Sequence, residues 1–200
     1  MVSNKLKFIF THINKTGGTS IASILDEYCE NTRYKHQFVI TKDYHPEWLP
    51  SAGMEEDCLY PLNSYFKFSV LRNPWDKLVS NWSKVTEDPK LKHISFRDWL
   101  LNRSEIKGFY FKNCLAVHPQ IDWISDKNGE VCVDFICRFE NLQDDFNIVC
   151  EKIGIPQQKL PHENPSMHKH YSEYYNDETK VFVEDYFEKD IKIFNYEFEE

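Results

Sequence analysis

The sequence predicts an α/β fold in which a central, mainly parallel sheet is flanked by helices. Three observations lead to this prediction. The apolar segment 6–13 is followed by a glycine-containing loop and then by residues with helical spacing of apolar side chains. The segment 65–71 is followed by a tight turn and a second segment of this kind. A third amphipathic helix is expected over residues 139–153. Strands that alternate with helices are typical of layered folds built on a parallel sheet.

Chain length and composition predict one domain over residues 1–200. Hydrophobic residues make up 41% of the chain and aromatic residues 16%, and both recur along its whole length. A chain of this size buries enough apolar surface for a stable core without disulfides or a structural metal. The six cysteines contain no C-x-x-C pair, so we expect reduced thiols and no zinc site.

The charge balance restricts the kind of ligand. The formal net charge is −8, whereas bulk binding of nucleic acid needs many lysine and arginine side chains, so no nucleic-acid partner is expected. The apolar run 6–13 is too short for a signal peptide core with a cleavage site or for a membrane span. We therefore expect a cytoplasmic protein, although a catalytic fragment of an anchored parent would look the same.

The elements around the first two strands follow from local signals. Residues 6–13 are predicted as a buried strand, residues 14–19 as a loop and residues 20–28 as a helix. A second helix opens after the strand 65–71, with Asn73 as its N-cap and Pro74 in the first position, and Asp76 favours the helix dipole. Its apolar face is formed by Trp75, Leu78, Val79, Trp82 and Val85.

The second half of the chain gives further helix and turn signals. A capping box at Ser95 predicts a short helix through residue 101. The Asn128-Gly129 pair predicts a hairpin turn between residues 121–124 and 131–136. The helix 139–153 ends at a glycine, and one last helix is predicted from about Asn176, with Val183, Phe187, Ile191 and Phe194 on one face.

Residues 12–20, with the sequence His-Ile-Asn-Lys-Thr-Gly-Gly-Thr-Ser, have the composition of an anion-binding loop. Glycines let backbone N–H groups turn toward a ligand, and the following helix begins with unsatisfied N–H donors. Lys15 adds a charge and neighbouring hydroxyls add donors, so a phosphate or phosphosulfate can be held without metal. The loop is not a Walker A motif, because Lys15 precedes the glycines. His12, at the end of the strand, is expected to orient the loop.

A second cluster lies at the next corner from strand to helix. Arg72 ends the strand and Ser80 lies on the helix, a placement that can direct a guanidinium and a hydroxyl to one phosphate. The simpler alternatives are a surface ion pair for Arg72 and a solvated helix position for Ser80.

Together, residues 12–20 and 68–80 resemble the two cofactor motifs of the sulfotransferases that use 3′-phosphoadenosine 5′-phosphosulfate (PAPS). They are most similar to the carbohydrate branch, which includes heparan sulfate 2-O-sulfotransferase and the chondroitin and dermatan sulfotransferases. This chain has Asn14 where proline is usual and Lys77 where arginine is frequent. Neither departure removes a proposed ligand. The resemblance implies a P-loop-like three-layer fold and sulfuryl transfer from PAPS, with 3′-phosphoadenosine 5′-phosphate (PAP) as the product and no metal required.

The resemblance also implies the cofactor contacts. The 5′-phosphosulfate would be bound by the loop residues Lys15, Thr16, Gly17, Gly18, Thr19 and Ser20. The 3′-phosphate would be bound by Arg72 and Ser80, and Ser166 lies in a region similar to a loop near the nucleotide. Lys15 would also stabilise the charge that develops on the leaving phosphate.

The general base is expected between the two motifs, where the related 2-O enzyme carries a histidine. His36 and His45 are the candidates, with Asp43 and Glu47 as acidic alternatives. Lys35-His36 is similar to a Lys-His pair of many bacterial members, whereas His45 lies closer to the sequence distance of the 2-O enzyme.

Other readings remain open. The segment 168–170, His-Lys-His, lacks further metal ligands at suitable spacing and is expected to be a solvated loop. A P-loop nucleotide kinase and a catalytically inactive module that binds PAP or a glycan are the competing functions. A carbohydrate acceptor is implied by the resemblance, although the acidic balance fits a highly sulfated polymer poorly.

Overall fold

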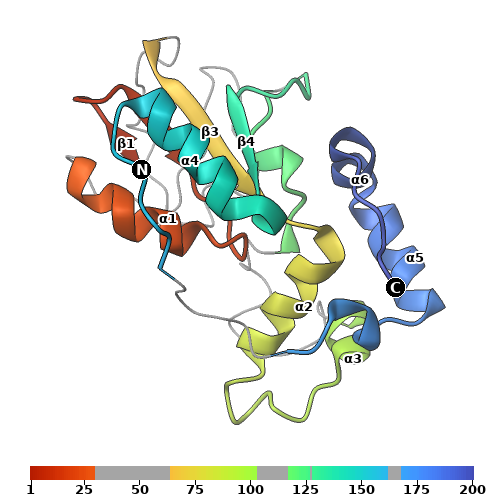
Figure 1. The fold of residues 1–200 in the computed structure, drawn as a ribbon. Helices are drawn as coiled ribbons and strands as arrows, with labels where there is room; N and C mark the ends of the chain where they lie inside the picture. Colours follow the sequence, from red (N-terminus) through yellow and green to blue (C-terminus); the bar gives the residue numbers. More distant parts are fainter. Residues whose placement is uncertain (30–63, 103–116, 127, 162–167) are drawn as a thin grey trace. The chain divides into compact units, whose positions relative to one another are not determined.

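The computed structural model describes residues 1–29, 64–102, 117–126, 128–161 and 168–200 (Figure 1). The chain divides into two compact units, one formed by Met1–Leu71 with Gln120–Asn164 and the other by Arg72–Pro119 with Pro165–Glu200. The single domain predicted over residues 1–200 stays a prediction.

The first unit contains a four-stranded sheet in the order β1-β2-β3-β4. The strands are Val2–Ser3 (β1), Phe8–Thr11 (β2), Phe66–Leu71 (β3) and Phe135–Arg138 (β4). β1 is antiparallel to β2, whereas β2 with β3 and β3 with β4 are parallel. The α/β class with a mainly parallel sheet is therefore confirmed.

Two helices of the first unit pack on the same face of this sheet. They are Gly18–Leu25 (α1) and Leu142–Ile153 (α4), and short 3-10 turns cover Asp26–Tyr28 (η1), Ile121–Trp123 (η5) and Phe139–Asn141 (η6). In Figure 1, α4 lies alongside β3 and β4. The shared core contains Phe8, Phe10, Phe68 and Val70 from the strands, Ile21 and Leu25 from α1, and Phe146 and Val149 from α4. Each of these side chains contributes about 1.5–3 kcal/mol by burial.

The described part of the second unit is helical. Its elements are Pro74–Val85 (α2), Phe96–Leu101 (α3), the 3-10 turn Tyr171–Tyr174 (η7), Asp177–Tyr186 (α5) and Glu188–Phe194 (α6). The predicted N-caps Asn73 and Ser95 accept backbone N–H bonds at the starts of α2 and α3. The predicted apolar face of α2 is also confirmed, because Trp75, Leu78 and Val79 belong to the buried core of this unit.

Two predicted elements differ from the structure. Ile121–Trp123 form the 3-10 turn η5 in place of a strand. The predicted hairpin is a short one, with the antiparallel bridge of Ser125 with Val131 and two backbone bonds, from the N–H of Asp126 to the carbonyl of Glu130 at 2.9 Å and from the N–H of Cys132 to the carbonyl of Ile124 at 2.7 Å. The carboxylate of Asp126 also accepts the N–H groups of Asn128 and Glu130, so a side chain supports the turn in addition to the backbone bonds. The last helix is split, because the backbone of Phe187 (φ −107°, ψ 22°) leaves the helical region between α5 and α6.

Within the residues that the structure describes, no helix has the length and the apolar run that crossing a bilayer requires.

Candidate functional site

The loop after β2 has the backbone pattern of an anion-binding turn. Lys15 has a φ of 68° and Gly17 a φ of 79°, so two residues in the left-handed region flank Thr16. Such alternation turns successive N–H groups toward one side and forms the concavities that hold phosphate in other proteins. Thr16 is fully buried, and its hydroxyl donates to the carbonyl of Ile13 at 2.9 Å, so this side chain also fixes the turn.

Close packing explains why both glycines are needed. A Cβ on Gly17 would lie 2.9 Å from Cδ2 of Phe139 and 3.0 Å from Cδ2 of Leu142. A Cβ on Gly18 would lie only 2.4 Å from Cδ2 of His12. The His12 ring is itself buried and stacks on Phe10 at a centroid distance of 5.5 Å. These contacts agree with the predicted role of His12 in orienting the loop.

The start of α1 is electrostatically suited to an anion. No side chain caps this helix at Gly17, and its first turn contains no acidic residue. The N-terminus of a helix carries partial positive charge and N–H donors that point outward along the axis. Thr19 is exposed here, whereas Ser20 is buried. The hydroxyls of these two residues therefore differ in their access to solvent.

The second corner holds Arg72 in a partly buried ion pair. Arg72 follows β3 directly, and its Nε donates to Oδ2 of Asp76 at 2.8 Å, with side-chain exposures of 6% and 18%. Arg72 thus forms an ion pair, as the simpler alternative expects, but the pair is partly buried and does not lie at an open surface. Ser80 lies on α2 and is 1% exposed, so the alternative of a solvated helix position is wrong. Lys77 is buried as well and donates to the carbonyl of His118 at 3.0 Å.

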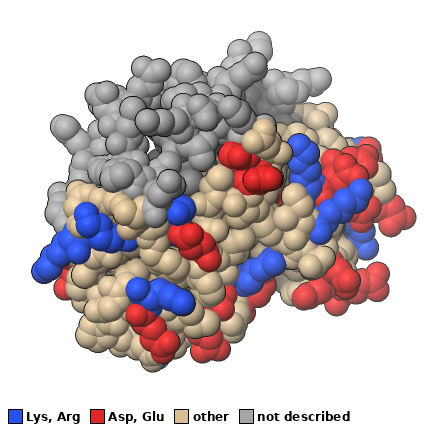
Figure 2. Space-filling model, turned by 90° about the horizontal axis from the view of Figure 1, so that it is seen from above, with Lys and Arg blue, Asp and Glu red and all other residues tan. Residues whose placement is uncertain are grey.

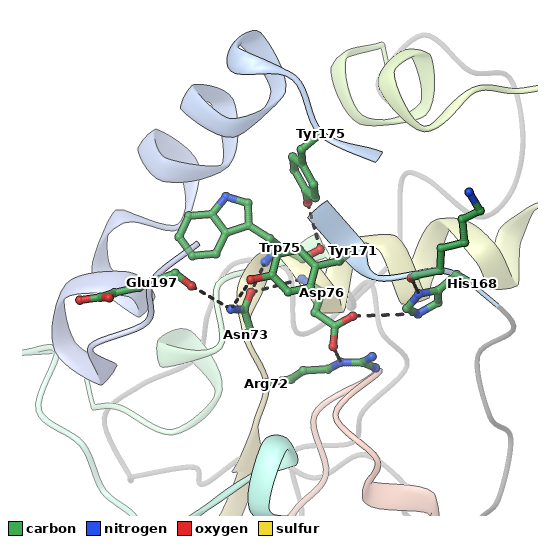
Figure 3. Close-up of polar contacts among 9 residues, drawn as sticks. Arg72, Asn73, Trp75, Asp76, His168, Tyr171, Tyr175 and Glu197 are labelled. Carbon is green, nitrogen blue, oxygen red and sulfur yellow. Dashed lines mark hydrogen bonds and ion pairs between the residues drawn. The ribbon is translucent and has the colours of Figure 1, made fainter. Parts of the chain in front are cut away.

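Asn73 connects the start of α2 with the end of the chain (Figure 3). Its Oδ1 accepts the N–H groups of Trp75 at 3.0 Å and Asp76 at 3.3 Å, and its Nδ2 donates to the carbonyl of Glu197 at 3.1 Å. Nδ2 also lies 3.4 Å from the hydroxyl of Tyr171. The residue beside Arg72 is therefore fixed from two sides.

Aromatic residues near the C-terminus complete this support. The ring of Phe198 makes edge contacts with Trp75, Tyr171 and Tyr175. The hydroxyl of Tyr175 donates to the carbonyl of Trp75 at 2.9 Å. Burial, together with the negative charge of Asp76, raises the pKa of Tyr175 well above its usual value.

His168 also belongs to this cluster, which the sequence patterns do not predict. The segment 168–170 was expected to be a solvated loop, which holds for the exposed Lys169 and His170. It is wrong for His168, whose side chain is 10% exposed and whose Nε2 lies 4.0 Å from Oδ1 of Asp76 (Figure 3). The two residues are far apart in sequence, and no local pattern connects them.

The structure places the candidate ligands in two groups. Lys15, Thr16, Gly17, Gly18, Thr19 and Ser20 all lie in the first unit. Arg72 and Ser80 lie in the second. The candidate bases His36 and His45 and the candidate ligand Ser166 lie outside the described residues, as do Asp43 and Glu47.

Comparison with known proteins decides the family. The model of the Sulfotransferase family matches residues 1–197 of the chain. The chain belongs to the sulfotransferase family. Membership makes it a transferase, with a nucleotide donor and a hydroxylated acceptor as the substrates that the family implies.

Two relatives of this sulfotransferase give further context. An uncharacterized protein of Archaeoglobus fulgidus is 32% identical over 96 residues, which are 48% of this chain and 73% of that protein. Carbohydrate sulfotransferase 10 of Gallus gallus is 24% identical over 193 residues, covering 77% of this chain and 52% of that protein. The chain thus spans about half the length of the Gallus gallus protein. No solved structure matches the chain significantly.

Proposed function

We propose that this sulfotransferase moves the sulfuryl group of PAPS onto a hydroxyl or an amine of an acceptor and releases PAP. The observation that carries the proposal is the loop before α1. Its two left-handed residues, Lys15 and Gly17, lead directly into a helix start that carries no side-chain cap. This arrangement favours a dianionic group at the loop, and the family match makes a sulfonated nucleotide the ligand that fits best.

The proposed donor contacts follow the two groups of residues. Lys15, the loop through Ser20 and the first N–H groups of α1 would bind the 5′-phosphosulfate. Arg72 and Ser80 would bind the 3′-phosphate, and Ser166 would contact the nucleotide. Arg72 suits this role because its ion pair with Asp76 fixes the orientation of a planar group that recognises phosphate oxygens by paired N–H bonds.

The proposed chemistry is a direct in-line transfer. The acceptor oxygen or nitrogen forms a bond to sulfur while the bond from sulfur to the bridging phosphate oxygen breaks, and the electron pair of that bond stays on the phosphate of PAP. The acceptor proton passes to a general base, for which His36 and His45 are the candidates. Lys15 would stabilise the negative charge on the leaving oxygen.

A carbohydrate is the acceptor class that the comparisons favour, because the relative in Gallus gallus is named as a carbohydrate sulfotransferase. The surface suggests a neutral or weakly charged glycan. The chain has a net charge of −8, and on the face drawn in Figure 2 the described lysine and arginine side chains are interspersed with aspartate and glutamate. A highly sulfated polymer would be repelled by this balance.

PAP release from PAPS, measured with a panel of acceptors, tests the proposal. The panel should contain neutral oligosaccharides, a polysulfated glycan and small amines. We expect stimulation of PAP release by at least one neutral oligosaccharide and little stimulation by the polysulfated glycan. Tight binding of PAP without release from PAPS in the presence of any acceptor would instead identify an inactive binding module. A thermal shift larger with ATP and Mg²⁺ than with PAP would contradict the choice of donor.

A further inference from the structure

A segment near the C-terminus contacts the start of α2. Residues 196–199, here called the strap, lie outside helices and strands and follow the end of α6, where Asn195 takes left-handed backbone angles (φ 52°, ψ 47°). Burial alternates along the strap, because its two aromatic residues are half-buried and its two glutamates are exposed. An alternation of this kind is typical of an extended chain with one face against a core. The aromatic residues are packed on the core of the second unit.

Two backbone groups of the strap make polar contacts with this unit (Figure 3). The carbonyl of Glu197 accepts from Nδ2 of Asn73 at 3.1 Å. The N–H of Glu199 donates to the hydroxyl of Tyr171 at 2.7 Å, and that hydroxyl also lies 3.4 Å from Nδ2 of Asn73. The glutamate side chains take no part in these bonds. The course of the strap is thus fixed through its backbone.

Phe198, between the two glutamates, is the anchor of the strap. Its ring makes edge contacts with Trp75, Tyr171 and Tyr175 at centroid distances of 5.6, 5.3 and 5.5 Å. The ammonium group of Lys180 lies 4.1 Å from the centroid of the same ring. Edge-on aromatic pairs and a cation over an aromatic ring are both favourable beyond the area that they bury. Loss of this ring should therefore release the strap from the unit.

A short chain of bonds leads from the strap to Arg72. Asn73, whose Nδ2 donates to the strap, accepts the N–H of Asp76 at its Oδ1. The carboxylate of Asp76 in turn accepts the Nε–H of Arg72 at 2.8 Å. Only two side chains, Asn73 and Asp76, thus separate the strap from the guanidinium. Because paired N–H bonds to phosphate depend on direction, a shift of this corner would weaken them.

We propose that the strap is a positioning element for Arg72 and thereby sets the preference for a nucleotide with a 3′-phosphate. The inference rests on the proposed function, because it takes Arg72 as the ligand of the 3′-phosphate of PAP. Docking of the strap and binding of that phosphate then support each other. By thermodynamic linkage, a docked strap favours the phosphate by the same factor by which the bound phosphate favours docking.

Calorimetry with PAP and adenosine 5′-monophosphate tests the inference in the full chain. Phe198→Ala removes the anchor of the strap. Asn73→Ser keeps a side chain that caps helices well but loses the Nδ2 donor to the strap. We expect the ratio of the two Kd values, monophosphate over PAP, to fall about fivefold or more in each variant, with the affinity for the monophosphate nearly unchanged. Partial unfolding would weaken both nucleotides alike and leave this ratio unchanged.

Two further variants separate positioning from a general effect of the substitutions. Phe198→Leu keeps an apolar side chain at the anchor and should recover part of the preference for PAP. Ile193→Ala removes an apolar side chain from α6 that is 48% exposed, and it should leave the Kd ratio at the wild-type value.

Hydrogen exchange of the unaltered chain tests the linkage without any variant. The amide of Glu199 is bonded to Tyr171 when the strap is docked, so its exchange rate reports undocking. Saturating PAP should slow this exchange about fivefold or more relative to saturating adenosine 5′-monophosphate. Equal exchange rates in the two complexes, or an unchanged Kd ratio in both Phe198→Ala and Asn73→Ser, would overturn this inference and leave the proposed function standing. Equal affinity of the wild-type chain for the two nucleotides would overturn both.

Discussion

His12 and Gly18 occupy adjoining space so closely that a methyl group on Gly18 would lie 2.4 Å from Cδ2 of the imidazole. The ring cannot easily retreat, because it is buried and stacks on Phe10, which in turn stacks on Phe68 at 4.9 Å. The start of α1 is thus held against the core of the sheet through one histidine. The proposed 5′-phosphosulfate loop takes its shape from this contact.

Gly18→Ala should therefore destabilise the fold, and His12→Ala in the same chain should make this destabilisation smaller. We expect Gly18→Ala alone to lower the free energy of unfolding by about 1–3 kcal/mol through overpacking. When His12 is already alanine, Gly18→Ala should lower the free energy of unfolding by less. Urea unfolding of the single and double variants should give a coupling free energy of about 1 kcal/mol or more. Gly129→Ala is the matched control, because its Cβ would meet nothing within 4 Å and its cost arises from a φ of 81°. Additive effects of Gly18→Ala and His12→Ala would contradict the proposed contact.

Lys15→Met should impair turnover more than binding or folding. If Lys15 stabilises the leaving phosphate, PAP release from PAPS should fall about 10²–10³-fold, as for loss of one preorganised donor. The affinity for PAP should fall much less, and the thermal midpoint should change little. Lys92→Met, at an exposed lysine of the second unit, serves as the control. A turnover of Lys15→Met close to that of wild type would remove Lys15 from the mechanism.

Loss of the Asn73 side chain should destabilise the second unit more than loss of a simple helix cap. Asn73→Ala removes the cap of α2 and also the bonds of Nδ2 to the C-terminal segment. We expect a cost of about 2–3 kcal/mol in urea unfolding. Ser95→Ala removes only an exposed cap at the start of α3 and should cost about 1 kcal/mol. Equal costs for the two variants would mean that the C-terminal contacts of Asn73 contribute nothing.

Stability at alkaline pH should depend on Tyr175. Its phenol has a raised pKa in the folded chain, so above pH 10 the folded state keeps a proton that the unfolded state loses. The stabilisation is fully present below pH 10 and declines as the pH rises further. Tyr175→Phe should therefore lose less unfolding free energy than wild type between about pH 9.5 and 11. Identical alkaline slopes for the two proteins would show that this phenol is not shielded.

One of the two candidate bases should be needed for chemistry. Of the two variants His36→Ala and His45→Ala, the one that removes the base should lower turnover about 10²–10⁴-fold, because general bases contribute on this scale. The same variant should lose the acidic limb of the pH–rate profile. The other variant should keep both the rate and the profile. Normal profiles in both single variants and in the double variant would shift attention to Asp43 and Glu47.

The sequence was informative where a signal is local. The parallel strands, the glycine loop, the Asn73 cap and the glycine end of α4 all follow from patterns spanning a few residues, and the structure confirms them. The Asn128-Gly129 signal correctly predicts a hairpin turn, because Ser125 and Val131 form an antiparallel bridge across it. The strand expected before it is wrong, since a turn signal does not say how far its flanks extend as strands.

The cluster around Asp76 shows the limit of local patterns. The sequence indicates only that Asp76 is favourable in the first turn of a helix and that His168 belongs to a solvated segment. The structure joins them through tertiary packing of segments that are distant in sequence. Neither residue type nor spacing carries that information, since an aspartate at a helix start and a histidine in a polar segment are both ordinary.

Nucleotide selectivity at Arg72 is the most direct test. Calorimetry should compare PAP with adenosine 5′-monophosphate, which lacks the 3′-phosphate, in wild type and in Arg72→Ala. We expect wild type to prefer PAP by at least about 100-fold and Arg72→Ala to lose most of that preference while keeping its affinity for the monophosphate. Equal affinity of the wild-type chain for the two nucleotides, or an unchanged preference in Arg72→Ala, would contradict the proposed donor site.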